Sequence, residues 1–348
     1  MHQLTIPRPD DWHLHLRDGA TLQAVTPYSA QVFARAIIMP NLNPPITTLE
    51  QASAYRQRIL AARPAGSSFE PLMTLYLTEQ TSVEDIAQAV AGGIISAVKL
   101  YPAGATTNSA GGVNDLRNCA ATLAAMAELG LPLLVHGELP RADIDIFARE
   151  QAFIDQVLMP LRERHPELKI VFEHVTSAAG AQLVTGNDPK LAGTFTPQHL
   201  LYNRNHLLAG GLKPHFYCMP ILKRETDREA LLEAATSGHP RVFLGTDSAP
   251  HPRHAKESAH GCAGCFSAPI ALGLYAEAFA QAGRLENLEA FASRNGPAFY
   301  ALPVNSDSLT LQHDSFAVPA AYPGGGEQLV PLRAGESIEW RIAEPRGG

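Results

Sequence analysis

Residues 11–18 read Asp-Trp-His-Leu-His-Leu-Arg-Asp, an apolar strand that carries two histidines. Residues two apart on a strand point to the same face, so the side chains of His13 and His15 leave the backbone together, roughly 6.6 Å apart. Their imidazoles can converge on one cation, at Zn–N distances of about 2.0–2.1 Å. Leu14 and Trp12 are expected to face the other way. Alone, the pair fits two ordinary strand histidines as well as a metal site, so the rest of the chain has to decide between them.

Strand-like apolar segments recur along the whole chain, with helical stretches between them. They cover residues 11–15, 36–39, 71–77, 96–101, 132–136, 169–174, 191–196 and 241–247. Alternation of strand and helix predicts a parallel sheet. Eight such units favour a (β/α)8 TIM barrel, with a doubly wound open sheet as the second choice. Capping boxes are predicted at Thr48-x-x-Gln51 and Thr81-x-x-Glu84, and Asn114 is expected to cap a further helix.

The composition is that of a globular protein whose net charge creates no electrostatic field that would attract a polyanion. The chain has 348 residues, 45% of them hydrophobic, and a net charge of −7, which argues against nucleic acid or an anionic membrane as partner. No run reaches 18 apolar residues and the N-terminus lacks a signal core, so a soluble cytoplasmic protein is expected. The rhythm of strands and helices stops near Pro303. We therefore expect a barrel over residues 1–303 and, over residues 304–348, a C-terminal extension that packs on it and covers one of its ends.

Four cysteines are too few for a disulfide scaffold at this length, so reduced thiols are expected. The pair Cys262-x-x-Cys265 invites a zinc or redox interpretation. No second cysteine pair lies at zinc-finger spacing, and a tight loop of small residues is the simpler prediction.

Polar side chains stand at the C-terminal ends of five predicted strands, where barrel enzymes carry their catalytic groups. They are His13 and His15 on the first strand, Lys99 on the fourth, His136 on the fifth, His174 on the sixth and Asp247 on the eighth. With 14 histidines in the chain, a few would reach strand ends by chance. Four that each close an apolar run, joined by an aspartate, indicate a metal centre.

Lys99 lies inside an apolar strand, where a charged ammonium is costly unless it is compensated. It could extend to the barrel mouth as an ordinary lysine, act as a Schiff-base nucleophile, or react with carbon dioxide to give a carbamate. A carbamate is an anionic oxygen donor that can bridge two metals, whereas an ammonium cannot ligate one. The surrounding histidines and aspartate favour the carbamate.

Asp247 could simply cap the next helix. In a two-metal centre it would instead act as general base towards an attacking water, and as general acid in the reverse direction. Two metals about 3.5–4 Å apart lower the pKa of a bridging water towards neutrality and polarise the substrate carbonyl.

Further polar residues follow the same strand ends. Arg17 leaves the same strand face as the histidine pair and can offer a bidentate fork to a carboxylate. Asn41 follows the second strand, and His251 comes four residues after Asp247. Each is individually more typical of a structural residue, and their placement around one barrel mouth makes them candidates. The polar loop that contains Thr106 and Thr107 suits a lid over that mouth, with a helix N-cap as the alternative.

These segments closely resemble the smaller bacterial dihydroorotases of the amidohydrolase superfamily. The resemblance runs from about residue 8 to residue 303 and agrees in the order and the context of every site segment. It is carried by residues 8–18, 39–41, 99–102, 133–138, 172–174, 196–200, 217–223 and 244–251.

The resemblance implies a centre of two zinc ions bridged by N6-carboxylated Lys99. One zinc would be held by His13, His15 and Asp247, and the other by His136 and His174. The substrate carboxylate would be held by Arg17, Asn41 and His251. Backbone groups near Met219 and Ala263 would contact the pyrimidine edge, and Thr106 and Thr107 would close over the substrate. The glycine-rich loop around Cys262 thereby gains a role without a metal.

The reaction implied is the reversible ring closure of N-carbamoyl-L-aspartate to L-dihydroorotate, the third step of de novo pyrimidine synthesis, in a homodimer. The nearest rival is another cyclic amidohydrolase, such as a hydantoinase or allantoinase, which shares the metals but lacks the carboxylate clamp. A metal-free barrel lyase that uses Lys99 as a Schiff base, and a non-catalytic binding protein, are the rivals from other classes.

Overall fold

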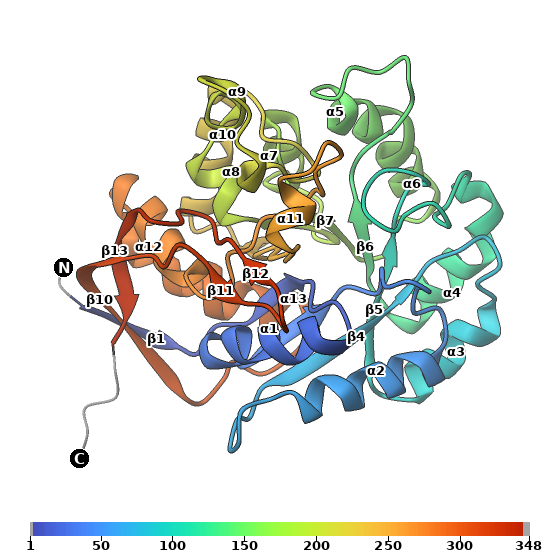
Figure 1. Cartoon of the computed structure of the whole chain (residues 1–348). Coiled ribbons are helices and arrows are strands. Elements are labelled where there is room, and N and C mark those ends of the chain that lie inside the picture. The colour runs from blue at the N-terminus through green and yellow to red at the C-terminus, as the bar shows by residue number, and fades with distance from the viewer. Residues whose placement is uncertain (1–2, 344–348) are drawn as a thin grey trace.

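A parallel sheet of eight strands forms the centre of the computed structural model, which describes residues 3–343 (Figure 1). Its strands are neighbours in chain order: β2 (Asp11–Leu14), β3 (Arg35–Ile38), β4 (Glu70–Tyr76), β5 (Ile95–Leu100), β6 (Leu133–His136), β7 (Ile170–Glu173), β8 (Leu191–Phe195) and β9 (Val242–Leu244). The first and last strands also meet, because Leu14 bridges Ser248 and the N–H of Asp247 donates to the carbonyl of His13 at 2.9 Å. The predicted TIM barrel is therefore confirmed, and the open sheet is wrong.

Helices follow the strands and cover the outside of the barrel (Figure 1). They are α1 (Gly19–Val32), α2 (Leu49–Ala61), α3 (Val83–Ala91), α4 (Ala120–Leu129), α5 (Arg149–Phe153), α6 (Met159–Arg164), α7 (Ala178–Val184), α8 (Pro197–Leu201), α9 (Arg204–Leu208), α10 (Glu225–Thr236), α11 (Arg253–Lys256), α12 (Ala271–Gln281) and α13 (Asn295–Tyr300). None of the helices in this part of the chain is long and apolar enough to cross a bilayer.

Of the three predicted helix N-caps, one is confirmed and two are wrong. Thr48 caps α2 in a complete capping box with Gln51. The box before α3 is formed by Ser82 and Asp85, one residue later than predicted, and the hydroxyl of Thr81 instead accepts from the N–H of Thr78. Asp115 rather than Asn114 caps the short 3-10 helix over Leu116–Cys119.

The inward-facing residues of the strands form a cluster inside the barrel. Trp12 belongs to this cluster, although it was predicted to face away from His13. Trp12 packs with Phe243 and Phe299 in this inner cluster, whereas Leu14 belongs to the outer core between strands and helices. A register irregularity between Asp11 and Leu14, where β2 pairs with β3, lets Trp12 and His13 both point inward. Helix α13 closes this cluster, with Tyr300 stacked on Trp12 at a centroid separation of 4.4 Å.

Between residues 304 and 343 the chain contributes two strands to a small antiparallel sheet against the side of the barrel. Strand β10 (Ser308–Ala317) pairs with β13 (Ser337–Ile342) and with β1 (Gln3–Pro7), an N-terminal strand that the sequence did not predict. Helix α12 approaches β13 so closely that a Cβ on Gly273 would lie 2.3 Å from the carbonyl oxygen of Trp340. A hairpin of β11 (Tyr322–Pro323) and β12 (Gln328–Leu329) continues the segment. This sheet lies beside α12 (Figure 1), and tail residues Val318 and Leu332 pack in one cluster with Leu222 and Cys265 of the loops that follow the strands.

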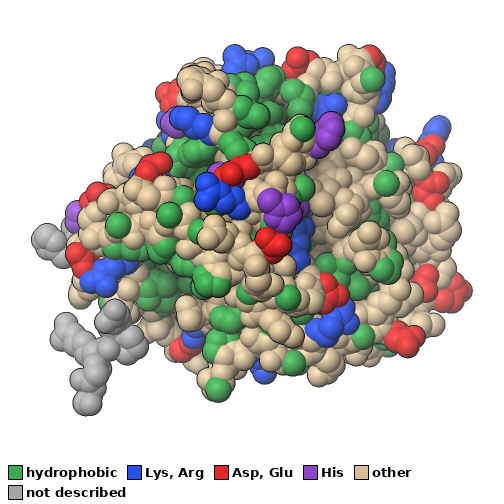
Figure 2. All heavy atoms as spheres, in the orientation of Figure 1, with side chains coloured by type: hydrophobic (Ala, Val, Ile, Leu, Met, Phe, Trp, Pro, Cys, Tyr) green, Lys and Arg blue, Asp and Glu red, His purple; other side chains and the backbone are tan. Residues whose placement is uncertain are grey.

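Charges of both signs are scattered over the face of the molecule seen in Figure 2, and no large patch of one sign appears there. This distribution agrees with the modest negative net charge. An anionic ligand therefore has to be held by a local group of side chains.

Candidate active site

Six predicted ligand residues converge at the C-terminal ends of the barrel strands. His13 lies on β2, Lys99 on β5 and His136 at the end of β6, while His15, His174 and Asp247 follow β2, β7 and β9. Two of them, His174 (φ 41°) and Asp247 (φ 46°), have left-handed backbone conformations, as does Arg17 (φ 60°). Such conformations cost about 1–3 kcal/mol each in a non-glycine residue and cluster at functional sites.

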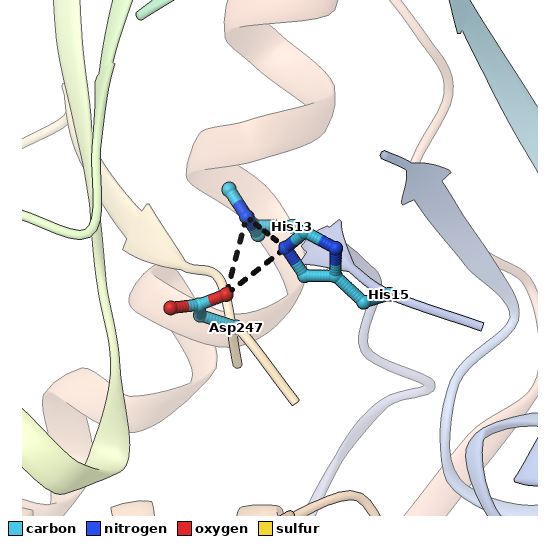
Figure 3. Close-up of side chains that lie close together, drawn as sticks. All are labelled: His13, His15 and Asp247. Atoms are coloured by element: carbon cyan, nitrogen blue, oxygen red, sulfur yellow. Dashed lines mark hydrogen bonds and ion pairs between the residues drawn. The ribbon is translucent and has the colours of Figure 1, made fainter. Parts of the chain in front are cut away.

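The first group of donors is a triangle formed by His13, His15 and Asp247 (Figure 3). The two Nε2 atoms are 3.2 Å apart, and Asp247 Oδ1 lies 3.3 Å from Nε2 of His13 and 3.2 Å from Nε2 of His15. Ligands about 2.0–2.1 Å from a tetrahedral zinc are separated by roughly 3.3–3.4 Å. The triangle therefore has the size of one face of a zinc coordination sphere.

Burial and charge act in opposite directions on the pKa values of the triangle. Burial lowers the pKa of His15 to about 4. Burial also opposes protonation of His13, but the carboxylates of Glu173 and Asp247 outweigh it and raise the pKa of His13 to about 9. For Asp247, burial is outweighed by the two histidines, which hold its pKa well below the usual range.

A second group of donors lies beside the first and includes His174, Glu173 and again His13. The His174 ring is edge-to-face with that of His136, at a centroid separation of 4.8 Å. Its Nδ1 is buried without a hydrogen-bond partner, and burial lowers its pKa well below the ordinary value. Neutral imidazoles and carboxylates are donors that zinc accepts, so both groups fit a divalent metal.

Lys99 is fully buried beneath these groups and forms an ion pair with Glu173. Its ammonium lies 4.8 Å from the ring centroid of Tyr101. Burial lowers the pKa of Lys99, although the Glu173 carboxylate opposes the shift. The other oxygen of Glu173 lies 3.0 Å from Nδ1 of His13, as an ion pair without the alignment of a hydrogen bond. Glu173 thus touches both a predicted ligand and the predicted bridge.

Asp11 ties together the two segments that supply the triangle. Its carboxylate accepts from the N–H of His13 at 3.1 Å and from the N–H and hydroxyl of Thr246 at 2.9 and 2.6 Å. Burial raises the pKa of Asp11 to about 7, although these donors oppose the shift. The backbones that carry His13 and Asp247 are therefore held in fixed relation to each other.

Arg17 lies at the edge of the site, against the chain that follows Asp247. Its Nε donates to the carbonyl of Pro250 at 3.0 Å, and its Nη2 lies 2.9 Å from Nε2 of His251. His251 Nε2 is also 2.9 Å from the carbonyl oxygen of Ala263. Burial and the neighbouring guanidinium lower the pKa of His251 to about 2, so this imidazole is neutral.

The predicted lid loop is tied to Asn41. The Asn41 amide donates to the carbonyl of Thr107 at 3.1 Å, and the Asn108 amide donates to the carbonyl of Asn41 at 3.0 Å. Two hydrogen bonds close the loop on itself. The N–H of Thr106 donates to the hydroxyl of Ser109, and this hydroxyl donates to the carbonyl of Thr106. Thr106 and Thr107 line the same cavity as the histidines and the aspartate at the strand ends.

One cavity of about 20 Å³ brings nearly all of the predicted residues together. Its walls are formed by His13, His15, Arg17, Asn41, Tyr101, Thr106, Thr107, His136, His174, Met219, Asp247, Ala249, Ala263 and Gly264. Of the predicted set, Lys99 lies beneath the cavity and His251 lies behind Arg17. No metal-binding group found in residues 3–343 includes a cysteine, and Cys262 and Cys265 are free thiols.

The sequence analysis missed residues that contact the predicted set. Glu173 and Glu138 touch His13 and His136, Asp11 holds two site segments, and Tyr101 lines the cavity with a buried hydroxyl that lacks a partner. Glu138 follows His136 by two residues and Glu173 precedes His174. An acid this close to a strand-end histidine is the pattern that could have revealed them.

The model of the amidohydrolase family matches residues 10–313. The chain is 72% identical to a dihydroorotase of Halorhodospira halophila, over 99% of this chain and 100% of that protein. Among solved structures, a dihydroorotase from Campylobacter jejuni is 40% identical, with a TM-score of 0.90 over 98% of both chains. A dihydroorotase from Saccharomyces cerevisiae, solved with 5-fluoroorotic acid, is 34% identical, with a TM-score of 0.92 over 99% of this chain and 100% of that one.

Hydantoinases are more distant. The L-hydantoinase of Arthrobacter aurescens is 16% identical, with a TM-score of 0.78, which shows a common fold alone. The chain belongs to the amidohydrolase family and, within it, to the dihydroorotases.

Proposed function

We propose that this protein interconverts N-carbamoyl-L-aspartate and L-dihydroorotate at a centre of two zinc ions. The observation that carries the proposal is the triangle of His13, His15 and Asp247, with edges of 3.2–3.3 Å, beside a second pair of histidines in the same cavity. When bound, the zinc ions would lower the pKa of a water and polarise the ring carbonyl.

Each group of residues has a role in the proposal. His13, His15 and Asp247 would hold one zinc, His136 and His174 the other, and Lys99, as a carbamate, would bridge them. Asp247 directs Oδ1 at the two histidines, which leaves Oδ2 to accept a proton in hydrolysis and to return it in ring closure.

Recognition of the substrate would depend on the groups around Arg17. Its guanidinium would pair with the carboxylate that does not react, with Asn41 and neutral His251 as hydrogen-bonding neighbours. Backbone groups near Met219 and Ala263 would contact the amide edge of the ring. A cavity of about 20 Å³ holds roughly one water, so the loop that carries Thr106 and Thr107 would have to open for the substrate and close again.

Metal analysis and activity assays on the same preparation test this proposal. We expect about two zinc ions per chain, hydrolysis of dihydroorotate and cyclisation of N-carbamoyl-L-aspartate, with little turnover of hydantoin or dihydrouracil. Active protein without a transition metal would refute the metal mechanism. Comparable turnover of dihydrouracil would refute the carboxylate clamp and favour the hydantoinase alternative.

We further propose that the enzyme is a cytoplasmic homodimer, as its relationship to dihydroorotases suggests, and light scattering of the purified protein tests the dimer. We also propose that residues 304–348 are an extension of the barrel over residues 1–303. Support comes from the pairing of β10 with β1 and from the close approach of β13 to α12.

A further inference from the structure

Glu138 is a fully buried carboxylate beside a predicted metal ligand. Its Oε2 lies 2.8 Å from Nε2 of His136, and its Oε1 has no hydrogen-bond partner. The bend that places it here needs a glycine, because a Cβ on Gly137 would lie 2.0 Å from the ring of Phe172. The N–H of Glu138 also donates to the carbonyl of His136 at 3.1 Å. The carboxylate is therefore held against the imidazole by the backbone itself.

We propose that Glu138 is a positioning residue that fixes which nitrogen of His136 faces the metals. The inference rests on the proposed zinc centre. An ionised carboxylate only accepts hydrogen bonds, so the imidazole has to place its N–H on Nε2. The lone pair is then on Nδ1, the one nitrogen of this cavity-lining ring that Glu138 leaves free. A carboxylate behind a metal-binding histidine fixes the ring orientation and raises its basicity.

The surroundings of Glu138 support a role for its charge. Among the ion pairs of the described residues, its one partner is His136, and no lysine or arginine pairs with it. A buried carboxylate without a cation is costly. A metal bound to the far side of the imidazole would offset that cost, because its positive charge acts through the ring on the carboxylate.

His13 provides a comparison on the other side of the site. Its Nε2 belongs to the donor triangle, and its Nδ1 lies 3.0 Å from the Glu173 carboxylate. Each metal would thus have one histidine with a glutamate behind it, but the two rings would use opposite nitrogens. Glu173 also pairs with Lys99, so its substitution would change two contacts. Glu138 has one such contact, which makes it the sharper test.

The experiment compares zinc affinities of the parent with those of Glu138→Leu and Glu138→Gln, by competition with a chelator. In Glu138→Leu we expect one of the two zinc ions to bind about 10- to 100-fold more weakly, with the other changed less than about threefold. Glu138→Gln keeps an oxygen that accepts the N–H, so its loss is expected to be smaller. Glu277→Gln is the matched control, because Glu277 is also a buried carboxylate but pairs with Arg333 outside the cavity.

The outcomes separate this inference from the proposed function. Parent-like affinity for both zinc ions in Glu138→Leu overturns it, and so does equal weakening of both. If Glu138→Leu does not fold, as judged by thermal unfolding of the metal-free protein, then Glu138→Gln has to show the selective weakening. A parent protein that binds no zinc and does not convert dihydroorotate would refute the proposed function itself.

Discussion

Arg17 offers the sharpest single-residue test of substrate recognition. We expect Arg17→Met to raise the KM for dihydroorotate at least tenfold while zinc content stays at the parent level. The lost charge-assisted contact is worth roughly 1.5–3 kcal/mol, and about 1.4 kcal/mol is one decade in affinity. Steady-state kinetics and metal analysis of the same sample measure both effects.

Arg58→Met is the control for Arg17→Met. Arg58 forms an exposed ion pair with Asp18, near Arg17 but outside the cavity that holds the metal-binding groups. Its loss is expected to change KM less than about twofold. An unchanged KM in Arg17→Met would contradict the assignment of Arg17 to the substrate carboxylate.

Lys99 tests the bridge between the two metals. Lys99→Ala is expected to lose activity and to bind less zinc, because the buried side chain beneath both donor groups is removed. Millimolar propionate should restore part of both, since a short carboxylate can enter the space and supply the missing oxygen donors. Restoration by short amines, with no response to acids, would favour a lysine that acts as an amine.

The convergence of the six proposed ligand residues was predictable because a barrel directs strand ends to one place, and a polar residue that closes an apolar strand is visible in the sequence. The predicted outward direction of the Trp12 side chain was wrong, because an irregularity in the pairing of β2 with β3 changes which residues of β2 face the inside of the barrel. The spacing of Glu138 and Glu173 from predicted ligands could have marked them as candidates. Their contacts with His136 and His13 depend on the direction of each side chain, which spacing in the sequence does not specify.

A substitution at Gly296 in helix α13 tests how tightly this helix packs on Trp12 inside the barrel. An alanine in place of a helical glycine usually stabilises by about 0.5–1 kcal/mol. At Gly296 we expect the opposite sign, because the added Cβ would lie 2.0 Å from Nε1 of Trp12. Overpacking of this kind costs about 1–3 kcal/mol. Thermal unfolding measures the loss, and Gly111→Ala, where nothing lies within 4 Å, should leave the unfolding temperature nearly unchanged. Equal unfolding temperatures for Gly296→Ala and the parent would contradict the tight contact.

The order and type of the barrel elements were predictable from local pattern, since each strand and helix carries its own periodicity. The first residues of helices were less predictable. Thr81 and Ser82 both fit an N-cap before α3, but only Ser82 forms a hydrogen bond with the first turn of the helix. Strand β1 was missed because the partner that stabilises it, β10, lies some 300 residues further along the chain. The sequence near Gln3–Pro7 contains nothing that identifies this partner.

The zinc centre is expected to stabilise the whole molecule as well as to catalyse. Its proposed ligands come from residues 13 to 247 and from five strands, so bound metal would link strands around most of the barrel. A ligand present at 100 times its Kd stabilises the folded state by about 2.7 kcal/mol. For a chain of 348 residues, with an unfolding entropy of about 2.1 cal/mol/K per residue, that corresponds to about 4 °C in unfolding temperature. We expect chelation to abolish activity and to lower the unfolding temperature together, and added zinc to restore both.

Asp247→Asn separates this linkage from a non-specific effect of the chelator. The substitution removes the charge of the one carboxylate in the donor triangle, so the variant should start at a lower unfolding temperature in the presence of zinc and respond less to chelation. The quantity to compare is the fall in unfolding temperature on chelation of each protein, because Asp247→Asn also removes the contacts with His13 and His15 from the metal-free state. If chelation abolishes activity but leaves the unfolding temperature of the parent unchanged, the metals do not connect the strands of the barrel. The six proposed ligands would then have to be reassigned to a centre held by fewer elements.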